Sequence, residues 1–185
     1  MDAGVPSPVR RYLFRRPERQ DAPQNTRTIL TTESNLKVRV RAAGPGDGDA
    51  LAQFLSRAAS DDNIDAFDVL GFLQEFVLPV AQVEAGQLFI AKQGWSIVGL
   101  ASVVFRHDGE IEIDALLIDP SVDRVRVGGQ LVEVASYFAR KISVSGLHVL
   151  ATEAARADLD AIGFAVLGVD ESIETTLALR MRMEV

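Results

Sequence analysis

One stretch of this 185-residue chain, residues 110–140, constrains the fold more than any other. Acidic and apolar residues alternate from 110 to 118, which predicts a half-buried β-strand. Asp119-Pro120 ends this strand, because proline cannot donate to a ladder. A short loop containing Gly128-Gly129 is expected next, and apolar residues then recur at helical spacing. The stretch therefore predicts a strand, a glycine loop and a helix, in that order.

This arrangement has two interpretations. Backbone N–H groups at the start of a helix point at a bound anion, and the helix dipole favours negative charge there, so the glycine loop can be a phosphate site. An ordinary βα unit with a flexible joint has the same pattern. Glycine loops are weak signals, so the stretch alone leaves both interpretations open.

The rest of the chain predicts further strands and helices by the same periodicities. Expected strands are 37–43, 87–92, 96–106, 146–150, 163–167 and 175–183. Expected helices follow a cap at Asp47 or Asp49, or span 67–76 and 154–162. Prolines at 6, 8, 17 and 23 predict an extended arm. The chain is therefore divided into a basic arm, 1–35, and one domain, 36–185.

The central stretch resembles the acetyl-CoA-binding core of the GCN5-related N-acetyltransferase (GNAT) superfamily, roughly V-x-P-x-x-[RQ]-x-x-G-x-[GA]-x-x-L. The positions that match this pattern are Ile118, Pro120, Gly128 and Leu131. Asp123 stands where Arg or Gln is usual, and Arg126 stands where the first glycine is usual. Residues 97–101 resemble the I-V-G-x-A pattern of the third strand, and Gly163-Phe164 resembles the G-F that follows the last helix. The resemblance thus includes a degenerate acetyl-CoA-binding loop.

The resemblance implies an α/β (α+β) fold with a mixed, mostly antiparallel central sheet of six to seven strands and about four flanking helices. It also implies an acetyl-CoA-dependent N-acetyltransferase that acts on a primary amine of a small molecule or a protein. The alternative is a catalytically inactive GNAT-fold subunit that binds or regulates a protein partner. The basic arm and the degenerate loop favour the inactive subunit, whereas the matching frame favours the enzyme, towards which we lean.

The resemblance also assigns site residues. It places the CoA pantetheine along Leu116 and Ile118, and the pyrophosphate on backbone N–H groups of the loop, namely Arg124, Val125, Arg126, Val127, Gly128 and Gly129. Glu112 aligns with the glutamate that serves as base in the histone-acetyltransferase branch, although a solvated row of carboxylates has the same pattern. Leu159 replaces the tyrosine that usually acts as acid. Tyr137 is expected to pack in the core.

Composition limits the remaining functions. The chain has no cysteine and two histidines, so thiol chemistry is excluded and a metal site is not expected. No apolar run spans a bilayer, so we expect no membrane contact and a cytoplasmic location. Residues 1–41 contain nine Arg and Lys residues and four acidic residues, so their net charge is +5. Because the whole chain has a net charge of −7, the remaining residues carry −12.

The basic arm suggests an acidic contact surface. It could bind that of its own domain or that of a second chain, as a homodimer or with a protein partner. Nucleic acid is not the expected partner, because a few arginines without interleaved lysines are a weak nucleic-acid signal.

Overall fold

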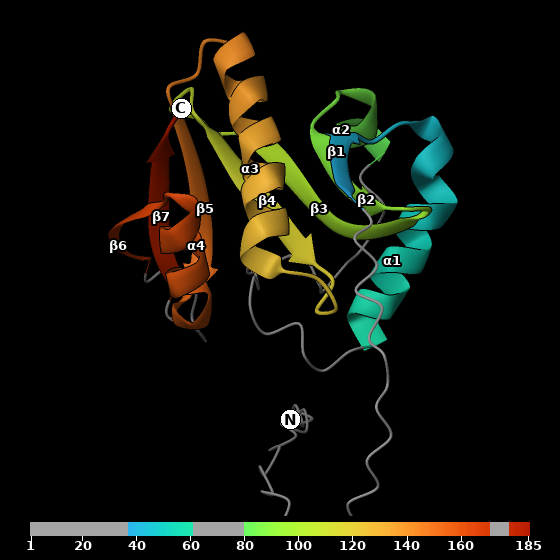
Figure 1. Cartoon of the computed structure of the whole chain (residues 1–185). Coiled ribbons are helices and arrows are strands. Elements are labelled where there is room, and N and C mark those ends of the chain that lie inside the picture. Colours follow the sequence, from blue (N-terminus) through green and yellow to red (C-terminus); the bar gives the residue numbers. More distant parts are fainter. Residues whose placement is uncertain (1–36, 61–79, 171–177) are drawn as a thin grey trace, which may run out of the picture. The chain divides into compact units, whose positions relative to one another are not determined.

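The computed structural model describes residues 37–60, 80–170 and 178–185. Its strands form one seven-stranded sheet in the order β1-β2-β3-β4-β5-β7-β6 (Figure 1). Only β4 and β5 are parallel; all other neighbours are antiparallel. The strands are β1 Val38–Ala42, β2 Leu88–Gln93, β3 Ser96–Phe105, β4 Ile111–Ile118, β5 Gly146–Thr152, β6 Ala165–Asp170 and β7 Ala178–Glu184. The expected mixed, mostly antiparallel sheet is confirmed.

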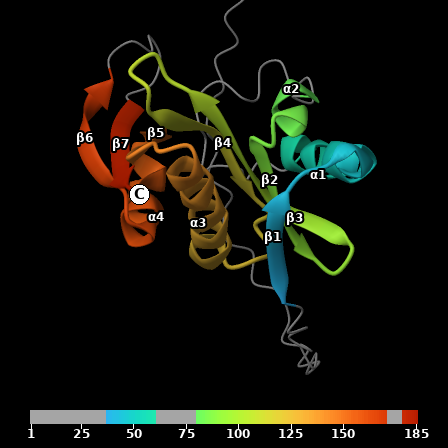
Figure 2. The same ribbon diagram turned by 90° about the horizontal axis from the view of Figure 1, so that it is seen from above.

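Helices cover both faces of the sheet. They are α1 Gly48–Ser60, α2 Val80–Glu84, α3 Arg124–Lys141 and α4 Arg156–Ile162, with short 3-10 turns at Pro45–Asp47 and Glu153–Ala155. Figure 2 shows α3 and α4 on one face and α1 and α2 on the other. Each face has its own apolar cluster: Leu131 of α3 belongs to one, and Phe54 of α1 belongs to the other.

A bulge interrupts the alternation of β4. Ser102 of β3 lies opposite Ala115, whereas Val103 lies opposite Ile113, so Asp114 is the extra residue. Ala115 therefore packs in the α1 cluster, on the opposite face from Ile113. The alternation in the sequence predicted that Ala115 and Ile113 lie on one side of the strand. This prediction is wrong, because a strict period of two cannot continue through an inserted residue.

Gly99 of β3 lets α3 pack close to the sheet. A Cβ at this position would lie 3.2 Å from the Leu117 carbonyl oxygen, 3.2 Å from Leu131 Cδ1 and 3.3 Å from Val127 Cγ1. These distances are shorter than ordinary van der Waals contacts, so a side chain would push the first turns of α3 outwards. Gly99 thereby fixes where the helix begins relative to the end of β4.

Some predictions lie outside the described residues. They are the basic arm 1–35, the helix expected over 67–76 and the first residues of the strand expected over 175–183. The short helix α2 follows the second of these gaps and was not expected from the sequence.

Candidate functional site

The parallel strands β4 and β5 separate along their length. Their pairing includes only Ile111 with Leu147, Glu112 with His148 and Ile113 with Val149. Beyond that point β4 continues to Ile118, paired with β3 alone. Figure 1 shows the two strands diverging towards the end of the sheet where α3 begins. Backbone N–H and C=O groups on the open side of β4 therefore have no partner among the described strands and can pair with an extended ligand.

Buried polar atoms without a partner come from the three elements that border this opening. Three of the five such atoms in the described residues are Oδ1 of Asp114 in β4, Oγ1 of Thr152 at the end of β5 and Oε1 of Gln130 in α3; the other two are Oγ of Ser102 in β3 and Nδ1 of His148 in β5. Leaving such groups unsatisfied costs folding free energy of about 1–3 kcal/mol each. A polar ligand in the opening can supply the missing hydrogen bonds.

The start of α3 differs from the sequence prediction. The helix begins at Arg124 with Asp123 as its N-cap, and Oδ1 of Asp123 accepts a hydrogen bond of 3.0 Å from the N–H of Arg126. The prediction that 123–129 forms a glycine loop is wrong, because this cap starts the helix several residues earlier. Gly128 and Gly129 lie in its second turn, where N–H groups bond within the helix.

The residues assigned to CoA divide into two groups. The side chains of Leu116 and Val127 are fully buried in the core, and Gly128 is buried too, so these residues shape the site from beneath. The partly or fully exposed group comprises Ile118, Arg124, Val125, Arg126 and Gly129. A Cβ built on Gly129 meets no heavy atom within 4 Å, which leaves the helix surface open there.

Glu112 is held by an arginine. Its Oε2 accepts a hydrogen bond of 2.7 Å from Nη1 of Arg106, and both side chains are 19% exposed. Arg106 also binds Asp108, at 2.8 Å. Glu112 is therefore a half-buried, ion-paired carboxylate at the last stretch where β4 and β5 still pair, rather than a member of a solvated row.

Asp114, at the bulge, is a second carboxylate on the same side of the sheet. Its Oδ2 accepts a hydrogen bond of 3.2 Å from Nε2 of Gln82 in α2, and its Oδ1 is the buried atom without a described partner. Asp114 comes directly after the last paired residue, Ile113, so it lies where the opening begins. From the sequence, Asp114 was interpreted only as one of the carboxylates that lie on one side of the predicted strand.

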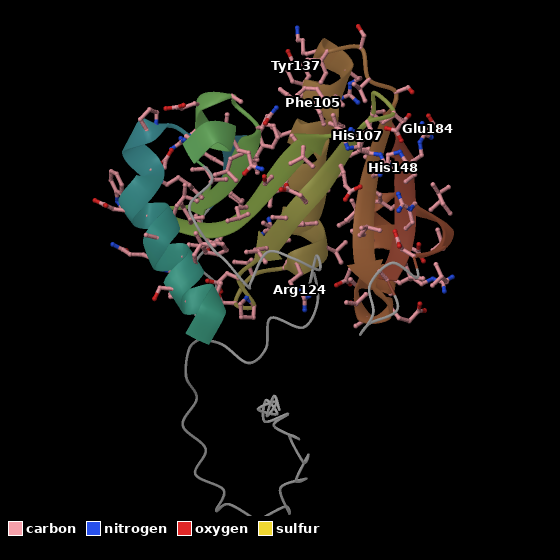
Figure 3. All side chains as sticks on the ribbon, turned by 180° about the vertical axis from the view of Figure 1, so that it is seen from behind. Phe105, His107, Arg124, Tyr137, His148 and Glu184 are labelled. Carbon is pink, nitrogen blue, oxygen red and sulfur yellow. The ribbon has the colours of Figure 1, made fainter. Side chains whose placement is uncertain are left out.

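A cluster around His148 was missed by sequence reasoning. Nε2 of His148 is hydrogen-bonded to Oε2 of Glu110, and Oε1 of Glu110 accepts from Nη2 of Arg182 at 2.7 Å. Arg182 and then His148 lower the pKa of Glu110 from 4.5 to about 2. The cluster lies directly over Gly146, where a Cβ would come within 2.5 Å of Arg182 and Glu110. In Figure 3 His148 lies at the far end of the domain from Arg124.

A hollow of about 180 Å³ lies between the end of α1 and the end of β4. Phe54, Arg57 and Asp119 line it together with Ile118. Nη2 of Arg57 donates to the Ile97 carbonyl at 3.0 Å and lies 4.0 Å from Asp119, so the guanidinium is anchored at the rim. The hollow extends the opening to the α1 face of the sheet.

The described residues offer no tyrosine acid at this site. Leu159 is 1% exposed and fills a core position. Tyr137 is 56% exposed, with Nζ of Lys141 5.2 Å from its ring centroid, so its predicted core role is wrong. Figure 3 places Tyr137 at the opposite end of α3 from Arg124. Within the same ranges no group of three or more His, Asp and Glu could hold a metal ion. No described helix is long and apolar enough to cross a membrane.

These features allow a test of whether acetyl-CoA fits. The unpaired side of β4, the partnerless polar atoms and the open surface at Gly129 suit an extended, polar co-substrate that ends in phosphates. Asp123 opposes the phosphates, because its carboxylate already occupies the Arg126 N–H. The Asp123 side chain is 61% exposed and can rotate away, so the residues present fit the co-substrate with one unfavourable charge.

Comparison with known proteins identifies the family but no curated close relative. No curated protein sequence matches the chain. An N-acetyltransferase from Staphylococcus aureus Mu50 superposes with a TM-score of 0.61 at 10% identity, covering 80% of this chain and 97% of that chain. A GNAT-family acetyltransferase from Streptococcus pneumoniae gives 0.61 at 18% identity, covering 80% and 99%.

A third similar structure has ligands bound. N-acetylglutamate synthase from Neisseria gonorrhoeae, complexed with coenzyme A and N-acetylglutamate, gives a TM-score of 0.60 at 18% identity, covering 80% of this chain and 35% of that chain. These likenesses establish the fold. In sequence, residues 50–168 match the acetyltransferase (GNAT) family, so the chain belongs to that family.

Proposed function

We propose that the chain is an acetyl-CoA-dependent N-acetyltransferase that acetylates a primary amine of a small molecule or a protein. The separation of β4 and β5 after Ile113 carries this proposal, because it leaves one side of β4 available as an edge for an extended thioester co-substrate. The N. gonorrhoeae protein of the same fold is described with coenzyme A and N-acetylglutamate bound, which supports both the co-substrate class and an amine acceptor.

In this proposal acetyl-CoA supplies an activated acetyl group. The main chain of Leu116 and Ile118 aligns the pantetheine, and the exposed face of the first turns of α3, from Arg124 to Gly129, holds the phosphates. Arg126 lies beside Asp123, with Nε 4.0 Å from Oδ2, and can turn from that carboxylate to the phosphates.

The attacking amine must lose a proton, and a carboxylate at the opening accepts it. We assign this role to Glu112, through Oε1, because Arg106 already binds Oε2. Asp114 is the second candidate, since its buried Oδ1 has no partner among the described residues and lies at the start of the opening. Water protonates the leaving thiolate, because a leucine stands at position 159.

A catalytically inactive GNAT-fold subunit is the alternative. Asp123 favours it, because this carboxylate places negative charge at the helix start that the phosphates approach. In that case the chain acts through a protein partner, either a second copy or another protein. The position of the basic arm, which was expected to make such a contact, lies outside the described residues.

A thermal-shift and calorimetric titration with acetyl-CoA tests the proposal. A ligand that binds only the folded state adds about 2.7 kcal/mol to the free energy of unfolding when its concentration is 100 times Kd. The melting temperature should therefore rise with the concentration of acetyl-CoA. Gly129→Gln should abolish this rise, while the melting temperature without ligand stays the same or increases slightly, since its Cβ space is open and glutamine favours the helix more than glycine.

Gly48→Gln is the matched control, because Gly48 is also helical and also has no heavy atom within 4 Å of its Cβ position. This variant should keep the full shift. If millimolar acetyl-CoA leaves the unaltered chain unshifted, the enzyme proposal fails. If acetyl-CoA binds but no amine is acetylated in a screen, the inactive subunit is favoured.

A further inference from the structure

A row of cations lies on one face of the β1–β2 edge of the sheet. Arg39 and Arg41 are alternate residues of β1 that face away from Val38, which packs in the α3 cluster, and Lys37 directly precedes the strand. Alternate residues on a strand are about 6.6 Å apart, so these three charges form a line rather than a point. Lys92 of β2 lies directly opposite Arg39.

The domain neutralises this row only in part, through Asp47, whose pKa is lowered chiefly by Arg41 and least by Lys92. Arg41 is bound by Asp47 through two hydrogen bonds of 2.7 Å. Lys37, Arg39 and Lys92 form no ion pair with any described residue. Like charges placed directly opposite on two strands destabilise the pair, yet Arg39 and Lys92 occupy that arrangement. A local cost of this kind is expected where a site serves an external ligand.

The chain's single tryptophan stands beside these cations. Gly94 and Trp95 form the two-residue turn between β2 and β3, in which Gly94 has φ of 62°. Positive φ at the first turn residue alone is the geometry of a type II′ turn and requires glycine there. The turn holds Trp95 at the tip of the hairpin, where it is 94% exposed.

Trp95 and the cations line one hollow. Its volume is about 690 Å³, and its lining includes Lys37, Arg39, Arg41, Lys92 and Trp95 but no acidic residue of the described ranges. From the sequence, nucleic acid was not the expected partner, because no lysine lies between the arginines of the arm. The fold supplies a lysine and an aromatic, since Lys92 and Trp95 come from more than 50 residues further along the chain.

We propose that this hollow binds a segment of single-stranded nucleic acid, with phosphates along Lys37, Arg39 and Lys92 and a base stacked on Trp95. A line of cations complements a chain of phosphates better than one isolated anion, and an indole provides a stacking surface for any base. An acidic peptide would leave the exposed indole unexplained. An anionic membrane is less suitable, because Trp95 stands among cations and Val40 is the only other apolar side chain of the described residues that lines the hollow, which leaves little apolar surface to insert.

The test uses the full chain and a single-stranded oligo(dT) of about 15 nucleotides at low salt. Because Trp95 is the sole tryptophan, its emission reports directly on this site, and stacking should quench it. The anisotropy of a labelled oligonucleotide gives Kd. Between about 50 and 200 mM salt, log K should fall with a slope of about −2, near −0.7 for each of three phosphates.

Variants separate this site from the N-terminal arginines, which stay present throughout. Trp95→Ala should weaken anisotropy-measured binding by about 5- to 150-fold, the usual range for one stacked base. Arg39→Gln with Lys92→Gln should weaken it and reduce the salt slope by about 1–2. Tyr137→Ala with Lys141→Gln is the matched control, an exposed cation–aromatic pair elsewhere, and should leave Kd unchanged.

The proposal is overturned if oligo(dT) leaves Trp95 emission unchanged at low salt, or if the Arg39/Lys92 variant binds as tightly as the unaltered chain. If ATP by itself, at the same phosphate concentration, quenches Trp95 emission, the ligand of this hollow would be a free nucleotide rather than a strand. If Trp95 emission shifts to the blue with phosphatidylserine vesicles and does not respond to oligo(dT), the ligand would be a membrane surface. None of these outcomes depends on acetyl transfer, and saturating acetyl-CoA should leave oligo(dT) binding intact.

Discussion

The two halves of β4 differ in how completely their surroundings are satisfied. From Ile111 to Ile113 the strand pairs on both sides, and the nearby carboxylates Glu110 and Glu112 are held by arginine. Beyond Ile113 the strand pairs only with β3, and Asp114 keeps a buried oxygen without a described partner. The first half is therefore held by ion pairs, although Nδ1 of His148 also lacks a described partner, whereas the second half has an unpaired edge that the proposed function assigns to a ligand.

The largest expected effect comes from exchanging a carboxylate on either side of this boundary. If Glu112 is the base, Glu112→Gln should lower kcat by about 10²–10⁴-fold, the usual contribution of a general base, and leave acetyl-CoA affinity nearly unchanged. Single-turnover acetylation of an accepted amine, with calorimetry for acetyl-CoA, measures both quantities.

Asp114→Asn is the matched variant on the other side of the boundary. It should reduce kcat by less than tenfold if Glu112 is the base, because the amide keeps an oxygen for Gln82. The reverse order of the two effects would transfer the role to Asp114. Equal and full activity in both variants would remove the carboxylates from the mechanism.

Substitutions at two glycines, one at each of the two regions, test this contrast through the free energy of unfolding. Gly146→Ala places a Cβ within 2.5 Å of the ends of the Arg182 and Glu110 side chains, which must move apart, so it should lower the free energy of unfolding by up to about 1 kcal/mol. Gly129→Ala meets no atom within 4 Å and lies inside α3, so it should raise that free energy by about 0.5–1 kcal/mol. Urea unfolding of the two variants measures the contrast, and equal effects would contradict it.

The ion pair of Glu110, beside the first half of β4, should also determine how the free energy of unfolding changes at acidic pH. The Glu110 pKa is lowered to about 2 in the folded chain, chiefly by Arg182. Below pH of about 4.5 the unfolded chain binds a proton that the folded chain does not bind until about pH 2. The stability from this ion pair is therefore complete above about pH 4.5 and is lost as the pH falls towards 2.

Glu110→Gln should flatten the fall of unfolding free energy over that range, measured by urea titrations at several pH values. Asp47→Asn is the matched comparison, because Arg41 lowers the Asp47 pKa to about 2 at the other end of the sheet. Both variants should flatten the curve, but only Glu110→Gln should also release His148. The NMR signals of the His148 ring at a single pH should then move relative to those of the unaltered chain. An unchanged acid slope in Glu110→Gln would show that the pair adds no stability.

The fold was more predictable than the site. Alternation and helical spacing located each described strand and helix except α2, because burial of one face is written locally in the sequence. The bulge at Asp114 was not predictable, since it depends on register with β3. Asp123 did carry a readable signal as an N-cap, but the two following glycines were interpreted as a loop.

The site depends on contacts between distant positions. The Glu110–His148–Arg182 cluster joins the residue before β4 to residues of β5 and β7, and no periodicity links them. Arg106, which holds Glu112, lies at the turn before β4 and looks like an ordinary surface arginine in sequence. Sequence patterns identify residue types suited to a role, whereas tertiary pairing decides which carboxylate stays available.

The smallest expected effect concerns the charge at the start of α3. Asp123→Asn keeps an oxygen that caps the Arg126 N–H, so stability should change by less than about 0.5 kcal/mol. It removes a negative charge beside the proposed phosphate site, on a side chain that is 61% exposed. Exposed charge pairs contribute about 0–1 kcal/mol, so acetyl-CoA should bind up to about fivefold more tightly.

Salt and a second variant distinguish charge from shape at this position. The gain in Asp123→Asn should shrink as salt rises, because the Debye length falls from about 10 Å at 0.1 M to 3 Å at 1 M. Arg126→Gly should weaken acetyl-CoA binding if the guanidinium contacts phosphate, and strengthen it if the side chain only obstructs. Calorimetry at both salt concentrations measures these changes. Unaltered affinity in Asp123→Asn at low salt would mean that the phosphates do not approach this end of α3.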